Sequence, residues 1–123
     1  MILHLDGDNV GNTIELLLLD GRLDDAVQVS ERIKDAFLWM RNRLRKLDGV
    51  VRLFAGDDLI AILPDGPQYL QALEFIREGF KERSGITISG GIGTTVEQAL
   101  DNLRRAKLMG GNRLINISSE ICR

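Results

Sequence analysis

Two short acidic segments hold the side chains best suited to chemistry: Asp6-Gly7-Asp8-Asn9 and Ala55-Gly56-Asp57-Asp58. The first follows an apolar run typical of a strand, and the second joins two such runs, so a sheet could bring the segments together. Converging carboxylates repel one another unless a cation lies between them. Oxygen ligands of this kind suit Mg²⁺, which binds one or two carboxylates together with substrate phosphates. The pattern therefore predicts a metal-dependent nucleotide enzyme.

The first segment offers both metal ligands and phosphate contacts. We predict that the Asp6 carboxylate and the Gly7 carbonyl bind metal, and that N–H groups in the first turn of the following helix hold phosphate oxygens. The residues predicted to bind nucleotide here are Asp8, Asn9, Val10 and Gly11. The alternative is an ordinary strand-to-helix loop with Asp8 or Asn9 as the N-cap. For this segment alone the ordinary loop is the stronger interpretation, because short motifs match by chance.

The second segment contributes a pair of adjacent carboxylates. Successive side chains that leave a turn diverge, so we predict that only Asp57 joins Asp6 at the metal. Asp58 would then assist catalysis by orienting a metal-bound water or by taking up a proton. A tight hairpin turn without a catalytic role explains the same residues about equally well.

A third candidate segment lies near the end of the chain, around Lys107 and Arg113. Lys107 would neutralise triphosphate charge, and Arg113 would supply a second cation. The ordinary alternative, which this segment alone favours, is a helix that ends with a lysine in its last turn and a glycine after it. The glycines of the preceding strand, Gly90, Gly91 and Gly93, fit either a bulge or bend, or close approach of a nucleotide or a second subunit.

These segments must be positioned by a small set of strands and helices. Apolar periodicity and turn signals predict, in chain order, strand Ile2–Leu5, helix Val10–Leu19, a long helix capped by Asp24 or Asp25 and ended by Asp48, strands Val50–Phe54 and Leu59–Leu63, a helix over residues 68–83, strand Ile86–Ile92, helix Val96–Met109 and strand Leu114–Ile117. This order contains the β-α-β-β-α-β core of a ferredoxin-like α+β fold, with extra helices. In that topology the first strand lies beside the hairpin, so Asp6 would face the Asp57–Asp58 turn.

The composition limits the classes of function. The chain has 123 residues, 44% of them hydrophobic and 28% charged, which fits a single domain over residues 1–123. A net charge of −2 argues against a broad basic surface and so against stable nucleic-acid binding. One histidine and one cysteine, the incidental Cys122, allow neither an internal disulfide nor a Cys/His zinc cluster. The longest apolar run, Leu16–Leu19, is too short to span a bilayer, and the first residues resemble no signal peptide, so we expect a cytoplasmic protein without a membrane partner.

In this order, the acidic, glycine and lysine segments resemble the palm domain of nucleotide cyclases and GGDEF-type synthases, and most closely the minimal CRISPR polymerase (mCpol) family. That family is in turn similar to the catalytic palm of the polymerase subunit of type III CRISPR complexes. The resemblance covers nearly the whole chain, and the segments that carry it are Leu5-Asp6-Gly7-Asp8-Asn9-Val10-Gly11, Phe54-Ala55-Gly56-Asp57-Asp58, Ser89-Gly90-Gly91-Ile92-Gly93, and Ala106-Lys107 through Gly110-Gly111-Asn112-Arg113.

The resemblance implies a nucleotidyltransferase of the nucleotide cyclase and polymerase type. Such an enzyme joins nucleoside triphosphates into a cyclic di- or oligonucleotide and releases pyrophosphate. The cyclic product serves antiviral (anti-phage) signalling through a separate effector protein. Carried over to this sequence, Asp6, the Gly7 carbonyl and Asp57 bind two Mg²⁺ or Mn²⁺ ions, and Lys107 contacts phosphates.

The sequence departs from GGDEF proteins in the substrate-binding positions. Gly11 stands in place of a lysine typical of those proteins, and Gly111 stands in place of their frequent arginine. Their guanine-reading residues are not evident in this sequence, so we expect ATP as the substrate.

A palm of this size offers one nucleotide site and little to hold a second substrate, so we expect two subunits to face each other as a homodimer. The alternative from another class is a catalytically silent module that binds and senses a nucleotide. The presence of Asp6, Asp57, Asp58 and Lys107 together speaks against that alternative. A phosphatase of the haloacid dehalogenase type, with Asp6 as its nucleophile, is a weaker alternative.

Overall fold

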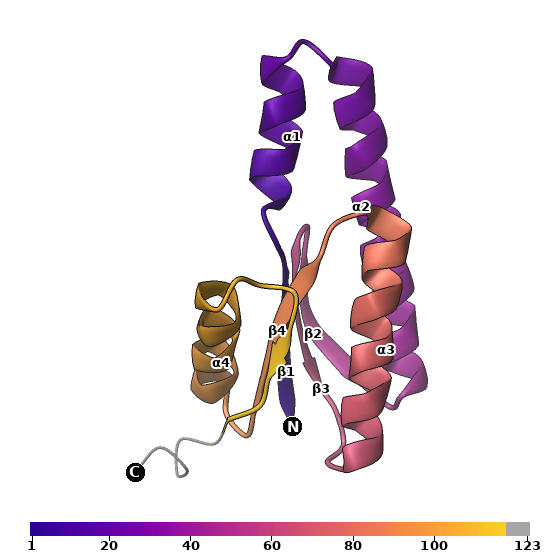
Figure 1. Ribbon diagram of the computed structural model, residues 1–123. Helices are drawn as coiled ribbons and strands as arrows, with labels where there is room; N and C mark the ends of the chain where they lie inside the picture. Colours follow the sequence, from indigo (N-terminus) through magenta and orange to yellow (C-terminus); the bar gives the residue numbers. More distant parts are fainter. Residues whose placement is uncertain (118–123) are drawn as a thin grey trace.

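The computed structural model describes residues 1–117, in which the strands and helices follow the predicted order (Figure 1). The strands are β1 (Ile2–Gly7), β2 (Val50–Ala55), β3 (Asp58–Ile62), β4 (Ile88–Gly93) and β5 (Leu114–Ile115). The helices are α1 (Val10–Leu19), α2 (Leu23–Lys46), α3 (Pro67–Ser84) and α4 (Val96–Leu108). Cys122 lies outside the described residues.

The five strands form one sheet in the order β2-β3-β1-β4-β5. The central strand, β1, runs antiparallel to both β3 and β4, and β2 pairs antiparallel with β3, whereas β5 pairs parallel with β4. Strands β1 to β4 therefore have the predicted ferredoxin-like arrangement, and the α+β fold class is confirmed. Asp6 pairs with Asp58 across β1 and β3, and the Gly7 N–H donates to the Asp57 carbonyl at 3.0 Å. The two acidic segments are thus neighbours, as the topology predicts.

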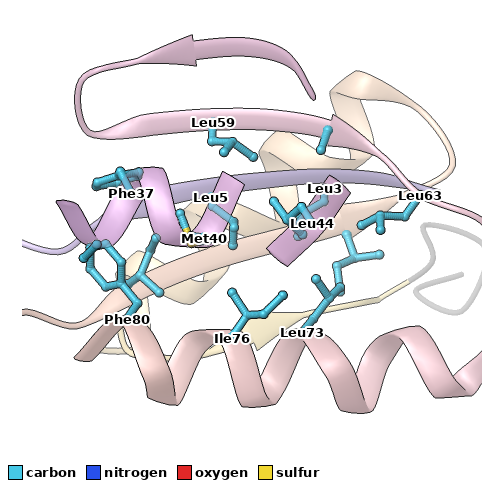
Figure 2. Packing of buried hydrophobic residues seen from close by; sticks show 14 of the residues in the cluster. Leu3, Leu5, Phe37, Met40, Leu44, Leu59, Leu63, Leu73, Ile76 and Phe80 are labelled. Atoms are coloured by element: carbon cyan, nitrogen blue, oxygen red, sulfur yellow. The ribbon is translucent and has the colours of Figure 1, made fainter. Parts of the chain in front are cut away.

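The side chains of β1 alternate between the two faces of the sheet. Leu3 and Leu5 are buried on the face covered by α2 and α3, whereas His4 and Asp6 point to the face that α4 partly covers. Figure 2 shows the core between the sheet, α2 and α3, whose largest buried members include Phe37, Met40, Leu44, Leu59, Leu73 and Phe80. This core holds β1 from one side and leaves the other face free for polar residues.

The glycines of β4 let α4 lie directly on the sheet. A Cβ on Gly91 would collide with the Ala99 carbonyl, and a Cβ on Gly93 would come within 2.8 Å of the Ala99 nitrogen. Gly90 faces the opposite side, where a Cβ would lie 2.6 Å from the Leu5 side chain. The pairing of β1 with β4 is regular through these residues. Close packing of the protein's own elements, rather than a bulge, a nucleotide or a second subunit, therefore accounts for the three glycines.

Some element boundaries differ from the prediction. Helix α2 begins before the predicted Asp24 or Asp25 cap, and no side chain caps it. Strand β4 begins at Ile88 rather than Ile86, because the Ser84 hydroxyl bonds both the N–H and the carbonyl of Ile86 and holds this residue in the turn after α3. Strand β5 covers only two residues.

Helix α1 and the first half of α2 project beyond the sheet as a helical hairpin (Figure 1). Helix α1 has no buried residue, and its Leu16, Leu18 and Leu19 side chains are exposed. Within residues 1–117, none of the helices combines the length and the hydropathy needed to cross a membrane.

Candidate active site

The acidic segments meet at the end of β1, beside the turn that joins β2 and β3. Asp6 lies opposite Asp58 in the sheet, and Asp57 precedes Asp58 in the turn. Burial raises the pKa of the Asp6 carboxyl above its ordinary value; Lys107 acts in the opposite direction, and the charges of Asp57 and Asp58 add to the rise. The pKa stays raised because burial, the largest effect, together with the neighbouring carboxylates outweighs the opposing effect of Lys107.

Asp58 and Asp57 have different surroundings. Asp58 Oδ1 lies 2.7 Å from His4 Nε2, and the His4 side chain is only 13% exposed. His4 Nδ1 has no hydrogen-bond partner within residues 1–117, so the neutral tautomer that donates from Nε2 fits this contact, since a proton on Nδ1 would be a buried, unpaired donor. Asp57 is exposed. The structure thus directs Asp58 to His4 and leaves Asp57 open to a ligand.

Lys107 extends from the last turn of α4 to the first acidic segment. Its Nζ donates to the Gly7 carbonyl and to Asp8 Oδ1, both at 2.9 Å, and lies 3.3 Å from Asp6 Oδ2. The Lys107 side chain is 31% exposed, so the ammonium group is also within reach of solvent. The structure therefore brings together Lys107, Asp6 and Gly7, which were all predicted for the site.

The Asp8 carboxylate is held by four donors from distant parts of the chain. Thr87 Oγ1 donates at 2.7 Å, Ser89 Oγ at 2.8 Å, the Asn112 N–H at 2.8 Å and Lys107 Nζ at 2.9 Å. Burial would raise the pKa of Asp8, but these hydrogen bonds outweigh burial and hold the pKa below its ordinary value of 3.8. The predicted nucleotide-binding role of Asp8 does not fit, because its carboxylate faces protein donors and would repel phosphate. Asp8 instead positions Lys107.

Sequence reasoning did not identify the partners of Asp8. A signal was present for two of them, because Thr87 and Ser89 are polar residues spaced two apart in an otherwise apolar and glycine segment, and such residues share one face of a strand. The sequence gives no signal for Asn112, because this residue binds Asp8 through its backbone N–H, a group that every residue except proline carries. Arg113, the predicted second cation, donates from Nε to the Gly111 carbonyl at 3.1 Å, and within residues 1–117 its side chain makes no hydrogen bond or ion pair with the acidic segments.

Gly111 lies where a side chain does not fit. Its φ is +77°, and a Cβ would lie 2.9 Å from the Asp8 carboxylate. A non-glycine residue would therefore combine backbone strain with a displaced Asp8.

The segment from Asn9 to Gly11 forms the entrance to α1. Asn9 has a left-handed conformation with a φ of 55°, and no side chain caps the helix. The N–H groups of the first turn therefore lack acceptors within the helix and can receive phosphate oxygens. The space beside Gly11 is open, because a Cβ there would meet no atom within 4 Å. The predicted phosphate-binding segment, which includes Val10, is thus unobstructed.

A pocket of about 230 Å³ opens beside Asp57, between α1, α2 and the β2–β3 turn. Its lining combines apolar side chains with a hydroxyl, an ammonium group and a carboxylate, from Val10, Ile14, Ser30, Ile33, Lys34, Gly56 and Asp57. Sequence reasoning missed Ser30 and Lys34, because they look like ordinary residues of an amphipathic helix until α1 is placed beside them. The pocket is next to the predicted metal and phosphate sites and can hold part of a nucleotide.

The donor atoms of the site suit a hard cation. Within the described part of the chain, no group of three or more Asp, Glu, His or Cys side chains is arranged to hold a metal ion by itself. The groups that could take part are the carboxylates of Asp6 and Asp57 and the Gly7 carbonyl. They fit Mg²⁺, which commonly binds one or two carboxylates and completes its coordination with water and substrate phosphates. The charges of Asp57 and Asp58, which contribute to the raised pKa of Asp6, also favour a cation beside these carboxylates.

Comparison with known proteins identifies the family of the chain. Residues 2–117 match the family described as the minimal CRISPR polymerase domain, mCpol. No curated protein matches the chain in sequence.

Solved structures of GGDEF domains share the fold. The GGDEF domain of DgcB from Caulobacter crescentus, solved in complex with c-di-GMP, has a TM-score of 0.66 and 18% identity, over 94% of this chain and 75% of that chain. The GGDEF domain of YfiN (TpbB) from Pseudomonas aeruginosa has a TM-score of 0.54 and 15% identity, over 95% of this chain and 76% of that chain. At these identities the likeness concerns the fold alone. Because the chain has this palm fold, the alternative of a phosphatase of the haloacid dehalogenase type does not apply.

Proposed function

The chain belongs to the minimal CRISPR polymerase (mCpol) family, and we propose that it joins nucleoside triphosphates into a cyclic di- or oligonucleotide in a metal-dependent reaction. Family and fold both indicate nucleotide polymerase or cyclase activity in the broad sense. The observation that carries the proposal is the convergence of Asp6, Asp57, Asp58 and Lys107 at one end of β1. The cyclic product would act in antiviral defence by controlling a separate effector protein.

The reaction is the attack of a ribose hydroxyl on the α-phosphorus of a second nucleotide, which forms a phosphodiester and releases pyrophosphate. A last attack of the same kind, on the α-phosphorus of the triphosphate that remains, closes the ring and releases another pyrophosphate. Two Mg²⁺ or Mn²⁺ ions between Asp6, Asp57 and the Gly7 carbonyl would activate the hydroxyl and neutralise the triphosphate. Asp58 takes up the hydroxyl proton, and His4 holds the Asp58 carboxylate in place through the contact at 2.7 Å. Lys107 offsets the charge that develops on the phosphates. Positioning and electrostatics therefore supply most of the catalysis.

We propose ATP as the substrate, because the guanine-reading residues of GGDEF proteins are not evident in this sequence. The pocket beside Asp57 offers Ser30 and Lys34 as hydrogen-bond donors to the ring nitrogens of a purine base.

A homodimer would supply the second nucleotide. The pocket has a volume of about 230 Å³, which is small even for a single drug-sized ligand. We therefore propose that two subunits place their sites face to face, each with one bound nucleotide.

The test of this function is product analysis by mass spectrometry. Purified protein is incubated with Mg²⁺ or Mn²⁺ and all four nucleoside triphosphates, beside Asp57→Ala and the control Asp101→Ala, which alters an exposed carboxylate on α4. We expect a cyclic adenine nucleotide from the unaltered protein and from the control, and none from Asp57→Ala. Nucleotide binding without any product would favour the silent sensing module instead.

A further inference from the structure

Lys107 occupies the space in front of the oxygens that are proposed to bind the first metal ion. Its Nζ lies 2.9 Å from the Gly7 carbonyl oxygen, 3.4 Å from the Asp6 carbonyl oxygen and 3.3 Å from Asp6 Oδ2. A divalent cation at bonding distance from the same oxygens would lie next to the ammonium group. Two positive groups so close together in a partly buried site repel strongly. The lysine and the ion therefore compete for one position.

Asp8 offers Lys107 a second contact, and this contact is fixed. Asp8 Oδ1 accepts from Nζ at 2.9 Å, and the same carboxylate is held by Thr87, Ser89 and the Asn112 N–H, with only 9% of its side chain exposed. Asp6 is different, because its side chain is 33% exposed and, within residues 1–117, its carboxylate has no partner except Lys107. A flexible lysine stem can thus leave Asp6 while it stays paired with Asp8.

We propose that Lys107 holds the place of the first metal ion, and that ion binding moves its ammonium group off Asp6 and Gly7 while Asp8 retains it. The inference rests on the proposed function, which puts a divalent cation at these oxygens. Before the ion arrives, the lysine compensates part of the carboxylate charge. After the ion has bound, the ammonium group would be withdrawn to Asp8, where it would be available to the triphosphate. Metal binding therefore prepares the phosphate contact.

A permanent ion pair would behave differently. In that case Nζ would keep its contacts with Asp6 and Gly7, and an ion would bind at other oxygens of the cluster, such as those of Asp57. The position of the Lys107 ammonium group during metal binding distinguishes the two cases.

The direct test is an NMR titration of the isotope-labelled protein with Mg²⁺ in the absence of nucleotide. We expect the signals of the Lys107 ammonium group and the Gly7 carbonyl to shift together along one saturable curve, while the signals of Thr87 and Ser89 stay in place. Calorimetry then compares Lys107→Met with the control Lys81→Met, which removes the same charge from an exposed lysine on α3. We expect Lys107→Met to bind Mg²⁺ about tenfold more tightly, because a neighbouring charge commonly changes the affinity of a site for a cation by this factor or more. Lys81→Met should bind Mg²⁺ as the unaltered protein does.

Each contrary result has a distinct meaning. If the Gly7 carbonyl responds to Mg²⁺ and the Lys107 signal does not, the exchange is overturned while the proposed metal site stands. If neither signal responds, and Asp6→Asn leaves Mg²⁺ binding unchanged, the metal site of the proposed function fails and the exchange fails with it. The NMR titration needs no substitution, so it remains decisive even if Lys107→Met does not fold.

Discussion

The Asp8 carboxylate links β1, β4, α4 and the turn after α4 through one side chain. Its pKa is lowered in the folded protein, so ionised Asp8 contributes stability above the ordinary value of 3.8, and this stability is lost as the pH falls through the lowered pKa. We expect Asp8→Asn to reduce the free energy of unfolding by about 2 kcal/mol at neutral pH, the usual size for hydrogen bonds to a charged group. Urea unfolding at neutral and acidic pH measures the effect.

Unfolding at acidic pH tests whether the charge of Asp8 is responsible for this difference in free energy. The difference between the unaltered protein and Asp8→Asn should shrink as Asp8 becomes protonated, whereas Asp101→Asn, an exposed carboxylate on α4, should change little at any pH. A difference of the same size at every pH would contradict the role assigned to the Asp8 charge.

At the scale of elements, the order of strands and helices was predictable because each element carries its own apolar pattern. Phe37, Met40 and Leu44 recur at spacings of three or four, and all three are buried in α2. The pairing of Asp6 with Asp58 follows from the topology once the order is known. The helical pattern depends on residues that are close together in the sequence. The strand pairing depends on a topology that has few alternatives.

Features that depend on the distance between elements were not predictable. Gly91 fits a nucleotide contact as well as helix packing until the Ala99 carbonyl is placed above it. Asp8 looks like a phosphate-binding residue until the register of β1 and β4 brings Ser89 to it. The role of Lys34 in the pocket appears only when α1 lies beside α2.

The close contact of α4 with β4 leads to a prediction about Gly91. We expect Gly91→Ala to lower the free energy of unfolding by about 2–3 kcal/mol, because an added methyl group would push the backbone of α4 away from the sheet. Urea unfolding measures the change. Gly11→Ala is the matched control, since a Cβ there meets no atom and alanine favours a helix. An unchanged unfolding midpoint for Gly91→Ala would show that the packing is looser than described.

For the whole molecule, the projecting helical hairpin carries exposed apolar surface on α1, the helix that begins at the site. Leu16 is 62% exposed and Leu19 is 75% exposed. We expect light scattering with ATP and Mg²⁺ to show a homodimer, and we expect Leu16→Lys combined with Leu19→Lys to weaken it and to lower product formation. Because neither side chain is buried, the melting temperature should not fall.

The control for the dimer prediction is Phe75→Lys, which alters an exposed apolar side chain on α3, away from the hairpin. This variant should remain dimeric and active. A protein that is strictly monomeric at its working concentration, and that still makes a cyclic product, would contradict the prediction.

The contact between Lys107 and Gly7 joins residues that are 100 positions apart in the chain. A ribosome releases β1 and both acidic turns long before it releases α4, and chains fold as they emerge. The nascent protein therefore carries its carboxylates without their lysine until α4 has emerged and docks on the glycines of β4. Translation products that stop before Lys107 lack the ammonium group that contacts Asp6, Gly7 and Asp8. Under the proposed function, such a fragment would be unable to make the cyclic product.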